Sequence, residues 1–371
     1  MRGTVLTIGI FCAHCAGLAA DGIWTAGSGS WTNTANWSSD TLPGIGDKAL
    51  FTGAGGPINN VSATVKALDF NTTSNAAEWA LYGSGVTLVA PAEVIVNTVN
   101  EAALSLPVAG SDGLIKKGPG YLLLSGSNTF SGTLKVEGGM VRVQDDTALG
   151  PVPETLNPAA IYLNGGGLSN ARTNMTVHVR RGITVGPLHG SFLARYYSPF
   201  VLNCPITGAG NIYITRQAER VWFMNPSNDY SGDLILGWDG PGRWDSPSAC
   251  SIVGLGASNV LPYGAGKGKV AAYGCFRGGF ELNGTVNTLN TLQTFGDLYL
   301  SNQRATPGRL RVGEDASSFG VGLFSEANTE FEKIGSGAVS LSVAPASKGL
   351  FIHSSGELSI ARPSALGRAT L

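Results

Sequence analysis

A short glycine-turn motif recurs along this 371-residue chain, and its repetition constrains the fold more than any other feature. Copies start at Lys117, Thr207 and Ile334, and each places apolar residues two and four positions after the second glycine of a G-x-G turn. That alternation is typical of a strand with one buried face. A short strand between glycine turns cannot bury its apolar face alone, so each copy must stack in parallel on the next.

A second match extends the repeat beyond the turn. Residues 128–136 correspond place for place to residues 228–236, and segments 132–150 and 349–367 both end on Ala-Leu-Gly. Unequal insertions separate the copies, and a stacked coil tolerates insertions because its neighbours stay in contact. We therefore predict an all-β protein, a right-handed parallel β-helix (solenoid) with irregular loops. A β-sandwich of antiparallel hairpins is the alternative architecture.

The composition agrees with a folded repeat protein that has few charged residues. Charged residues make up 13 % of the chain against about 25 % in ordinary soluble domains, and the formal net charge is -1. Hydrophobic residues make up 43 %, which is enough apolar side chain to build a core and excludes a disordered glycine-rich linker. Because nucleic-acid binding needs a basic surface, the near-zero net charge argues against a nucleic-acid partner.

The first residues are typical of a secretory signal peptide. Arg2 precedes an apolar run over residues 5–18, and small residues follow where a signal peptidase would cut. A C-x-x-C pair lies within this segment and would be removed with it. No apolar run of about 18 residues follows, so we expect no transmembrane segment in the mature chain. The disulfide state of the three remaining cysteines is left open: Cys204, Cys250 and Cys275.

The chain divides into three expected parts. Residues 1–20 form the signal peptide, residues 21–112 an N-terminal cap with the first coils, and residues 113–371 a β-helix of degenerate repeats that ends within a repeat. Trp24, Trp31 and Trp37 lie near the mature start. We interpret these indoles as a cap that shields the first coil from water, with stacking on sugars as the alternative.

Residues 114–139 resemble the autotransporter-associated β-strand repeat family. The match is made by Leu114, Lys117, Gly118, Gly120, Leu122, Leu124, Gly126, Asn128, Phe130, Gly132, Gly138 and Gly139. Residues 259–282 also resemble the segment between such repeats, and residues 24–51 resemble the start of long secreted proteins that contain them. The resemblance implies an exported, passenger-like β-helix that is extracellular or held at the cell surface in association with the outer membrane. Its implied role is structural or adhesive, although no outer-membrane barrel follows in this sequence.

One insertion suggests a different function. Two tryptophans, two aspartates and an arginine gather within residues 238–245, and ring stacking with hydrogen bonds to hydroxyls is how proteins hold sugars. The simpler interpretation is a long turn folded over its own aromatic rings. The alternative function is carbohydrate binding or polysaccharide degradation by a lyase or hydrolase, which would need carboxylates converging beside this loop. The candidate glycan contacts are Trp238, Asp239, Arg243, Trp244 and Asp245.

The remaining polar residues do not form a recognisable catalytic pattern. Asp145 and Asp146 precede a turn, where acidic residues commonly cap the chain. The mature histidines have no partner at metal-ligand spacing, and no nucleophile-elbow signature is present. The sequence therefore predicts a protein without catalytic residues, metal ligands or cofactors. Its expected partners are cell-surface glycans or other surface proteins.

Overall fold

The computed structural model describes residues 21–72, 78–98, 100–171, 173–195, 198–215, 220–237, 252–273, 278–314, 319–343 and 347–360. The expected signal peptide, Cys250, Cys275 and the whole of the 238–245 loop lie outside these ranges. Within them, Cys204 is a buried free thiol, and burial raises its pKa to about 12.

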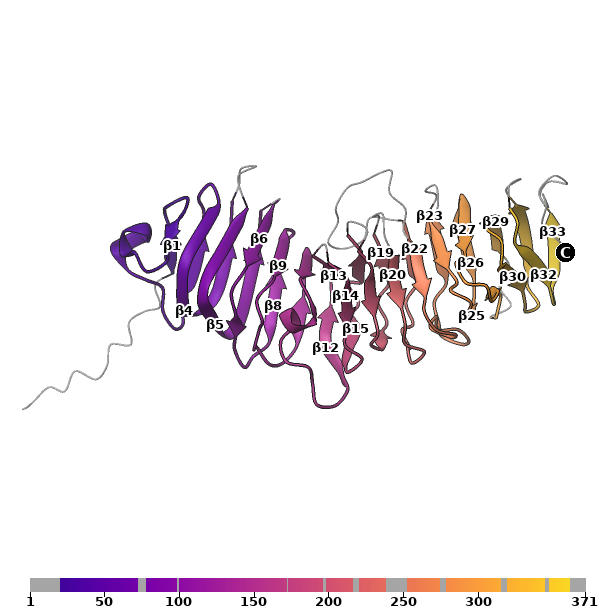
Figure 1. The fold of residues 1–371 in the computed structure, drawn as a ribbon, viewed down its shortest axis with the longest axis horizontal. Coiled ribbons are helices and arrows are strands. Elements are labelled where there is room, and N and C mark those ends of the chain that lie inside the picture. Colours follow the sequence, from indigo (N-terminus) through magenta and orange to yellow (C-terminus); the bar gives the residue numbers. More distant parts are fainter. Residues whose placement is uncertain are drawn as a thin grey trace, which may run out of the picture.

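The described residues form an elongated stack of short strands, each lying beside the next coil from one end of the molecule to the other (Figure 1). The strands pair in parallel along the whole stack, and the one antiparallel contact described is an isolated bridge between Trp24 and Trp37. Helical structure is confined to three short 3-10 turns: η1 (Thr34–Asn36), η2 (Ser38–Asp40) and η3 (Asp146–Leu149). The predicted parallel β-helix is confirmed, and the β-sandwich is excluded.

The strands of the stack form three sheets. The 20-stranded sheet contains β1 (Gly22–Trp24), β2 (Gly29–Ser30), β3 (Lys48–Phe51), β4 (Gly56–Phe70), β5 (Trp79–Val96), β6 (Glu101–Leu104), β7 (Val108–Ala109), β8 (Leu114–Lys117), β9 (Tyr121–Leu124), β10 (Leu134–Val136), β11 (Met140–Val143), β12 (Asn157–Leu163), β13 (Gly166–Asn170), β15 (Arg181–Val185), β16 (Gly190–Leu193), β18 (Ile206–Gly208), β19 (Ile212–Ile214), β21 (Leu234–Leu236), β23 (Val270–Tyr273) and β26 (Leu292–Phe295). The 9-stranded sheet contains β14 (Met175–Val177), β17 (Phe200–Leu202), β20 (Arg220–Phe223), β22 (Ile252–Leu255), β24 (Gly279–Glu281), β27 (Asp297–Ser301), β29 (Phe319–Ser325), β31 (Ala338–Val343) and β33 (Glu357–Ile360). The 4-stranded sheet contains β25 (Val286–Leu289), β28 (Gly308–Val312), β30 (Thr329–Lys333) and β32 (Leu350–His353).

The core consists of apolar columns that run along the stack. One column is built from residues in direct register on β8, β10, β12, β15 and β18, all of them buried: Leu114, Leu134, Ile161, Ile183 and Ile206. Each side chain is thus covered by the same position of the coils before and after it. This stacking buries the inward face that a single short strand cannot bury alone.

The tryptophans near the mature start belong to the core. Trp24, Trp31 and Trp37 are at most 2 % exposed. The Trp37 ring meets the other two edge-on, with centroids 5.1 Å from Trp24 and 4.6 Å from Trp31. Its indole N–H donates to the Trp31 carbonyl at 2.9 Å, and Phe51 packs beneath the cluster. Because the rings are covered, their alternative interpretation as a sugar-stacking platform is wrong.

The repeated Asn-x-aromatic motif is explained by the coil corners. The Asn128 side chain accepts a hydrogen bond from the Val108 backbone N–H at 2.8 Å and donates to the Ala148 carbonyl at 2.7 Å. Asn228 occupies the same position, accepting from the Ile206 N–H and donating to the Val260 carbonyl, each at 2.9 Å. Each side-chain amide therefore joins the coil before it to the coil after it. Both asparagines lie outside the strands, where no backbone ladder makes this connection. The asparagines of this motif therefore hold neighbouring coils together.

Candidate functional site

The repeat buries one of two adjacent lysines. Lys117, which matches the family repeat in the sequence, points outward and lies 2.6 Å from the Glu93 carboxylate. Lys116 is the inward residue, fully buried in the column between Val94 and Val136. A shift of one residue along a strand exchanges its two faces, which is why residue type alone could not separate the two lysines.

The Lys116 ammonium lies in a cradle of backbone carbonyls. It donates to the Lys117 and Gly118 oxygens at 2.7 Å each and to the Gly138 oxygen, one coil further on, at 3.1 Å. No carboxylate pairs with it among the residues that the structure describes. Burial lowers the pKa of Lys116 to about 7. The side chain is closed off from solvent, and its hydrogen bonds join two coils.

Lys333 repeats this arrangement near the other end of the stack. Its ammonium donates to the Ile334 oxygen, to the Gly335 oxygen at 3.1 Å and to the Ser355 oxygen at 3.5 Å. Burial lowers the pKa of Lys333 as well. Both lysines stand two residues before the first glycine of a G-x-G turn, and this spacing is the sequence signal that identifies them.

The acidic pair before the Ala-Leu-Gly turn has the capping role that we expected. Asp145 caps η3 by accepting from the Thr147 N–H at 2.9 Å. The Asp146 carboxylate is held by Arg181, whose Nε lies 3.0 Å and 3.1 Å from its two oxygens. The same buried guanidinium donates to the Gly150 carbonyl at 2.5 Å. These acids therefore fix the turn.

The described ranges contain no group of three or more histidine, cysteine, aspartate or glutamate side chains placed to hold a metal ion. The candidate glycan contacts Trp238, Asp239, Arg243, Trp244 and Asp245 lie outside these ranges, so their arrangement stays a prediction. Over the same ranges, no helix is both long enough and apolar enough to cross a membrane.

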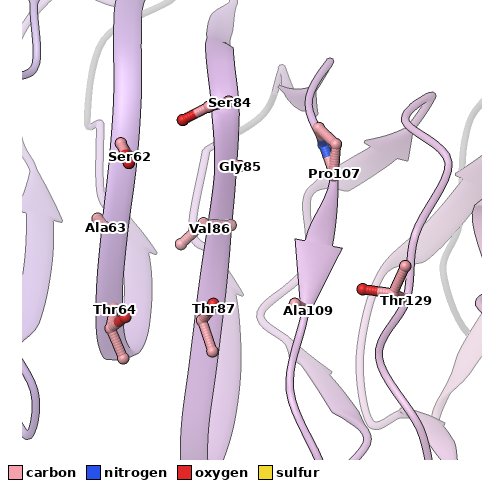
Figure 2. Close-up of a pocket in the computed structure, with 10 residues that line it drawn as sticks. All are labelled: Ser62, Ala63, Thr64, Ser84, Gly85, Val86, Thr87, Pro107, Ala109 and Thr129. Atoms are coloured by element: carbon pink, nitrogen blue, oxygen red, sulfur yellow. The ribbon is translucent and has the colours of Figure 1, made fainter.

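A polar groove of about 440 Å³ crosses the outer face of β4, β5 and β7 (Figure 2). Its lining is Ser62, Ala63, Thr64, Ser84, Gly85, Val86, Thr87, Pro107, Ala109 and Thr129. The strand alternation explains these positions, because Val65 and Leu88 point into the core while the preceding Thr64 and Thr87 point outward. Sequence analysis missed this groove, since residues 56–96 contain no copy of the repeat.

The coil register places the groove's small polar groups in a row. Thr64 pairs with Thr87, and Thr87 pairs with Ala109 in the next coil. Thr129 completes the row, because its backbone N–H donates to the carbonyl of Val108 at 2.8 Å. Gly85 also lines the groove. A Cβ at this position would lie 2.9 Å from the Pro107 carbonyl oxygen, so a side chain does not fit here without a shift.

The groove's hydroxyls are open to an external partner. In the described part of the chain, the hydroxyls of Ser62, Thr64, Thr87 and Thr129 form no hydrogen bond, and Ser84 has one long contact of 3.4 Å to the Val61 carbonyl. Further along the same sheet, Thr184 and Thr207 contact each other at 3.2 Å. Stacked hydroxyls on this sheet can therefore satisfy one another, but those in the groove do not.

Comparison with known proteins gives two matches to the sequence. Residues 114–143 match the family described as Passenger-associated-transport-repeat. The chain is also 32 % identical, over 222 residues, to the Adhesin BmaC autotransporter of Brucella suis biovar 1 (strain 1330). That alignment covers 57 % of this chain and 6 % of the relative, so the chain spans a small part of that protein's length. The comparison with solved structures found no match.

The family match covers four consecutive strands of the stack. Residues 114–143 hold the first G-x-G turn, the buried Lys116, the bridging Asn128 and strands β8 to β11. The resemblance stated from the sequence is thereby confirmed, and residues 114–143 are a repeat of the kind found in autotransporter passengers.

Proposed function

We propose that this chain is a passenger-like adhesive protein, exported and displayed at the cell surface, which works by contact and not by catalysis. The observation behind this proposal is the passenger repeat at residues 114–143, built as consecutive coils of the solenoid. The similarity to an adhesin autotransporter supports the same conclusion. The chain corresponds to a small part of that relative's length.

The architecture suits such a role physically. A solenoid holds long faces rigid, since each coil is fixed by its two neighbours, and extended binding surfaces are the usual product of this construction. Several charged side chains on these faces are paired, which adds order to the surface. Arg309, for example, lies 2.6 Å from the Glu330 carboxylate and 3.2 Å from that of Glu332.

Surface display tests the proposal directly. The chain would be fused to an outer-membrane anchor in a non-adherent bacterium, and its exposure checked with an antibody on intact cells. We expect displaying cells to adhere to epithelial monolayers at least several-fold more than cells that display the anchor alone. Equal adherence of the two strains, with exposure verified, would refute the adhesive function.

The alternative function rests on the 238–245 loop. If this loop binds or cleaves glycans, the substitutions Trp238→Ala and Trp244→Ala should abolish retention on a glycan array or the release of reducing ends from polysaccharides. Our proposal predicts no release of reducing ends by the unsubstituted chain. Sustained release that depends on Asp239 or Asp245 would establish the enzymatic alternative in its place.

A further inference from the structure

We propose that the groove over β4, β5 and β7 binds an uncharged glycan chain, laid across the strands along the axis of the solenoid. This inference rests on the adhesive function proposed above and names the ligand class of one contact surface. It assigns the ligand to a site on early coils, far in sequence from the 238–245 loop.

The groove's hydroxyls match the chemistry of sugar hydroxyls. A threonine or serine hydroxyl can both donate and accept a hydrogen bond, as a sugar hydroxyl does. Successive coils repeat at about 4.8 Å, so the row places the Thr64 and Thr87 hydroxyls on adjacent coils and the Thr129 hydroxyl two coils beyond Thr87, across Ala109. Because these hydroxyls lack partners within the described chain, a ligand would gain their hydrogen bonds without breaking internal ones.

The electrostatics favour a neutral ligand. No charged residue lines the groove. The nearest outward cation along β4, Lys66, is paired with the Asp21 carboxylate at 3.6 Å. A sulfated or uronic-acid polymer would find no guanidinium or ammonium to replace its hydration, whereas an uncharged glycan needs none.

A peptide is a poorer occupant than a glycan. Peptides that bind sheets usually add a strand at a free edge. Here β5 is already paired on both sides, with β4 and with β7, so its backbone groups are engaged. The lining also contains no aromatic, leucine or isoleucine side chain against which a peptide's apolar side chains could pack. A hydroxyl-rich chain that contacts side-chain oxygens therefore fits this surface better.

The test uses the purified chain and immobilised polysaccharides, with dextran, laminarin and hydroxyethyl cellulose as neutral probes and heparin and alginate as anionic ones. The double variant Thr64→Val and Thr87→Val removes two hydroxyls and preserves side-chain shape and strand propensity. The variant Ala109→Arg places a long cation in the groove. Thr184→Val with Thr207→Val is the matched control, because it makes the same change on the same sheet outside the groove.

We expect at least one neutral polysaccharide to bind, with affinity nearly constant between low and high salt. Loss of two hydrogen bonds should weaken binding about tenfold in the threonine double variant, and Ala109→Arg should weaken it at least as much. The control should bind like the unsubstituted chain, and circular dichroism should show all variants folded.

Three results would overturn the inference: no neutral probe binds, only anionic probes bind, or the groove variants bind as tightly as the control. The cell-adhesion assay separates this outcome from failure of the proposed function. Cells that adhere normally while the groove variants change nothing would retain the adhesive function and reject the groove. Cells that do not adhere at all would reject the function itself.

Discussion

The ammonium nitrogen of Lys116 lies 3.1 Å from the carbonyl oxygen of Gly138, which belongs to the next coil of the solenoid. Together with its contacts to the Lys117 and Gly118 carbonyls, this bond fixes the G-x-G corner to its neighbour. Lys116→Met would keep the apolar stem but leave three partly buried carbonyls without the ammonium donor. We expect a loss of about 2–4 kcal/mol in the free energy of unfolding, because each unsatisfied buried group costs about 1–3 kcal/mol and removing a buried charge offsets part of this.

Urea denaturation followed by circular dichroism measures this loss. The matched control is Lys135→Met, which makes the same change at an exposed position on the neighbouring strand β10. That control should shift the free energy of unfolding by less than about 0.5 kcal/mol. Equal stability of the two variants would mean that the carbonyl cradle adds nothing to the fold.

The same lysine should make stability depend on pH. The pKa of Lys116 is about 7 in the folded chain and near 10.5 when it is unfolded, so the unfolded chain binds more protons between these values. The free energy of unfolding should therefore increase as the pH rises from about 7 toward 10. Thermal melts of the unsubstituted chain and of Lys116→Met across this window test the point. The rise in melting temperature with pH should be smaller in Lys116→Met than in the unsubstituted chain. Parallel curves of melting temperature against pH would contradict the lowered pKa of Lys116.

Asn128 gives a second prediction about the repeat. Asn128→Ala would leave the Val108 N–H and the Ala148 carbonyl unpaired in a buried corner, for an expected loss of about 2–4 kcal/mol. The exposed neighbour Ser127 supplies the control, as Ser127→Ala. Asn128→Asp adds a diagnostic, because a buried carboxyl there should have a raised pKa and can donate to Ala148 only when protonated. This variant should be more stable at pH 5 than at pH 7, and a pH-independent melting temperature would argue against the bridge.

Local pattern was sufficient to predict the fold. Alternating apolar residues after a glycine turn, as in Leu122 and Leu124, specify a strand with one buried face, and their recurrence specifies stacking. The matched asparagines at 128 and 228 were visible in the sequence, but their role was not. An Asn side chain can cap, turn or bridge, and only the placement of Val108 and Ala148 on adjoining coils selects the bridge.

The groove could not be predicted for a related reason. It depends on how Thr64, Thr87 and Ala109 come into register, and the pairing of β4 with β5 contains three register shifts that no local pattern encodes. The two lysines at 116 and 117 illustrate the same limit, since a shift of one residue decides which side chain is buried. Residue type identified the motif, and the three-dimensional register determined what each residue does.

Gly139 tests how closely the coils approach each other. Its φ of 59° lies in the left-handed region that alanine can adopt, whereas the φ of 94° at Gly264 lies beyond it. Backbone preference alone therefore predicts that alanine is tolerated better at 139 than at 264. The contacts predict the reverse, because a Cβ on Gly139 would lie 2.2 Å from the Gly120 oxygen, while nothing lies within 4 Å of a Cβ on Gly264.

We expect the steric clash at Gly139 to outweigh the backbone preference. Gly139→Ala should destabilise the chain by about 3 kcal/mol or more, since the clash is with backbone of the adjacent coil, which cannot rotate away. Gly264→Ala should cost only about 1 kcal/mol, from the positive φ alone. Urea denaturation of both variants shows which substitution lowers the free energy of unfolding more. If Gly264→Ala proved the more damaging substitution, the spacing of coils at the G-x-G corner would be looser than the structure describes.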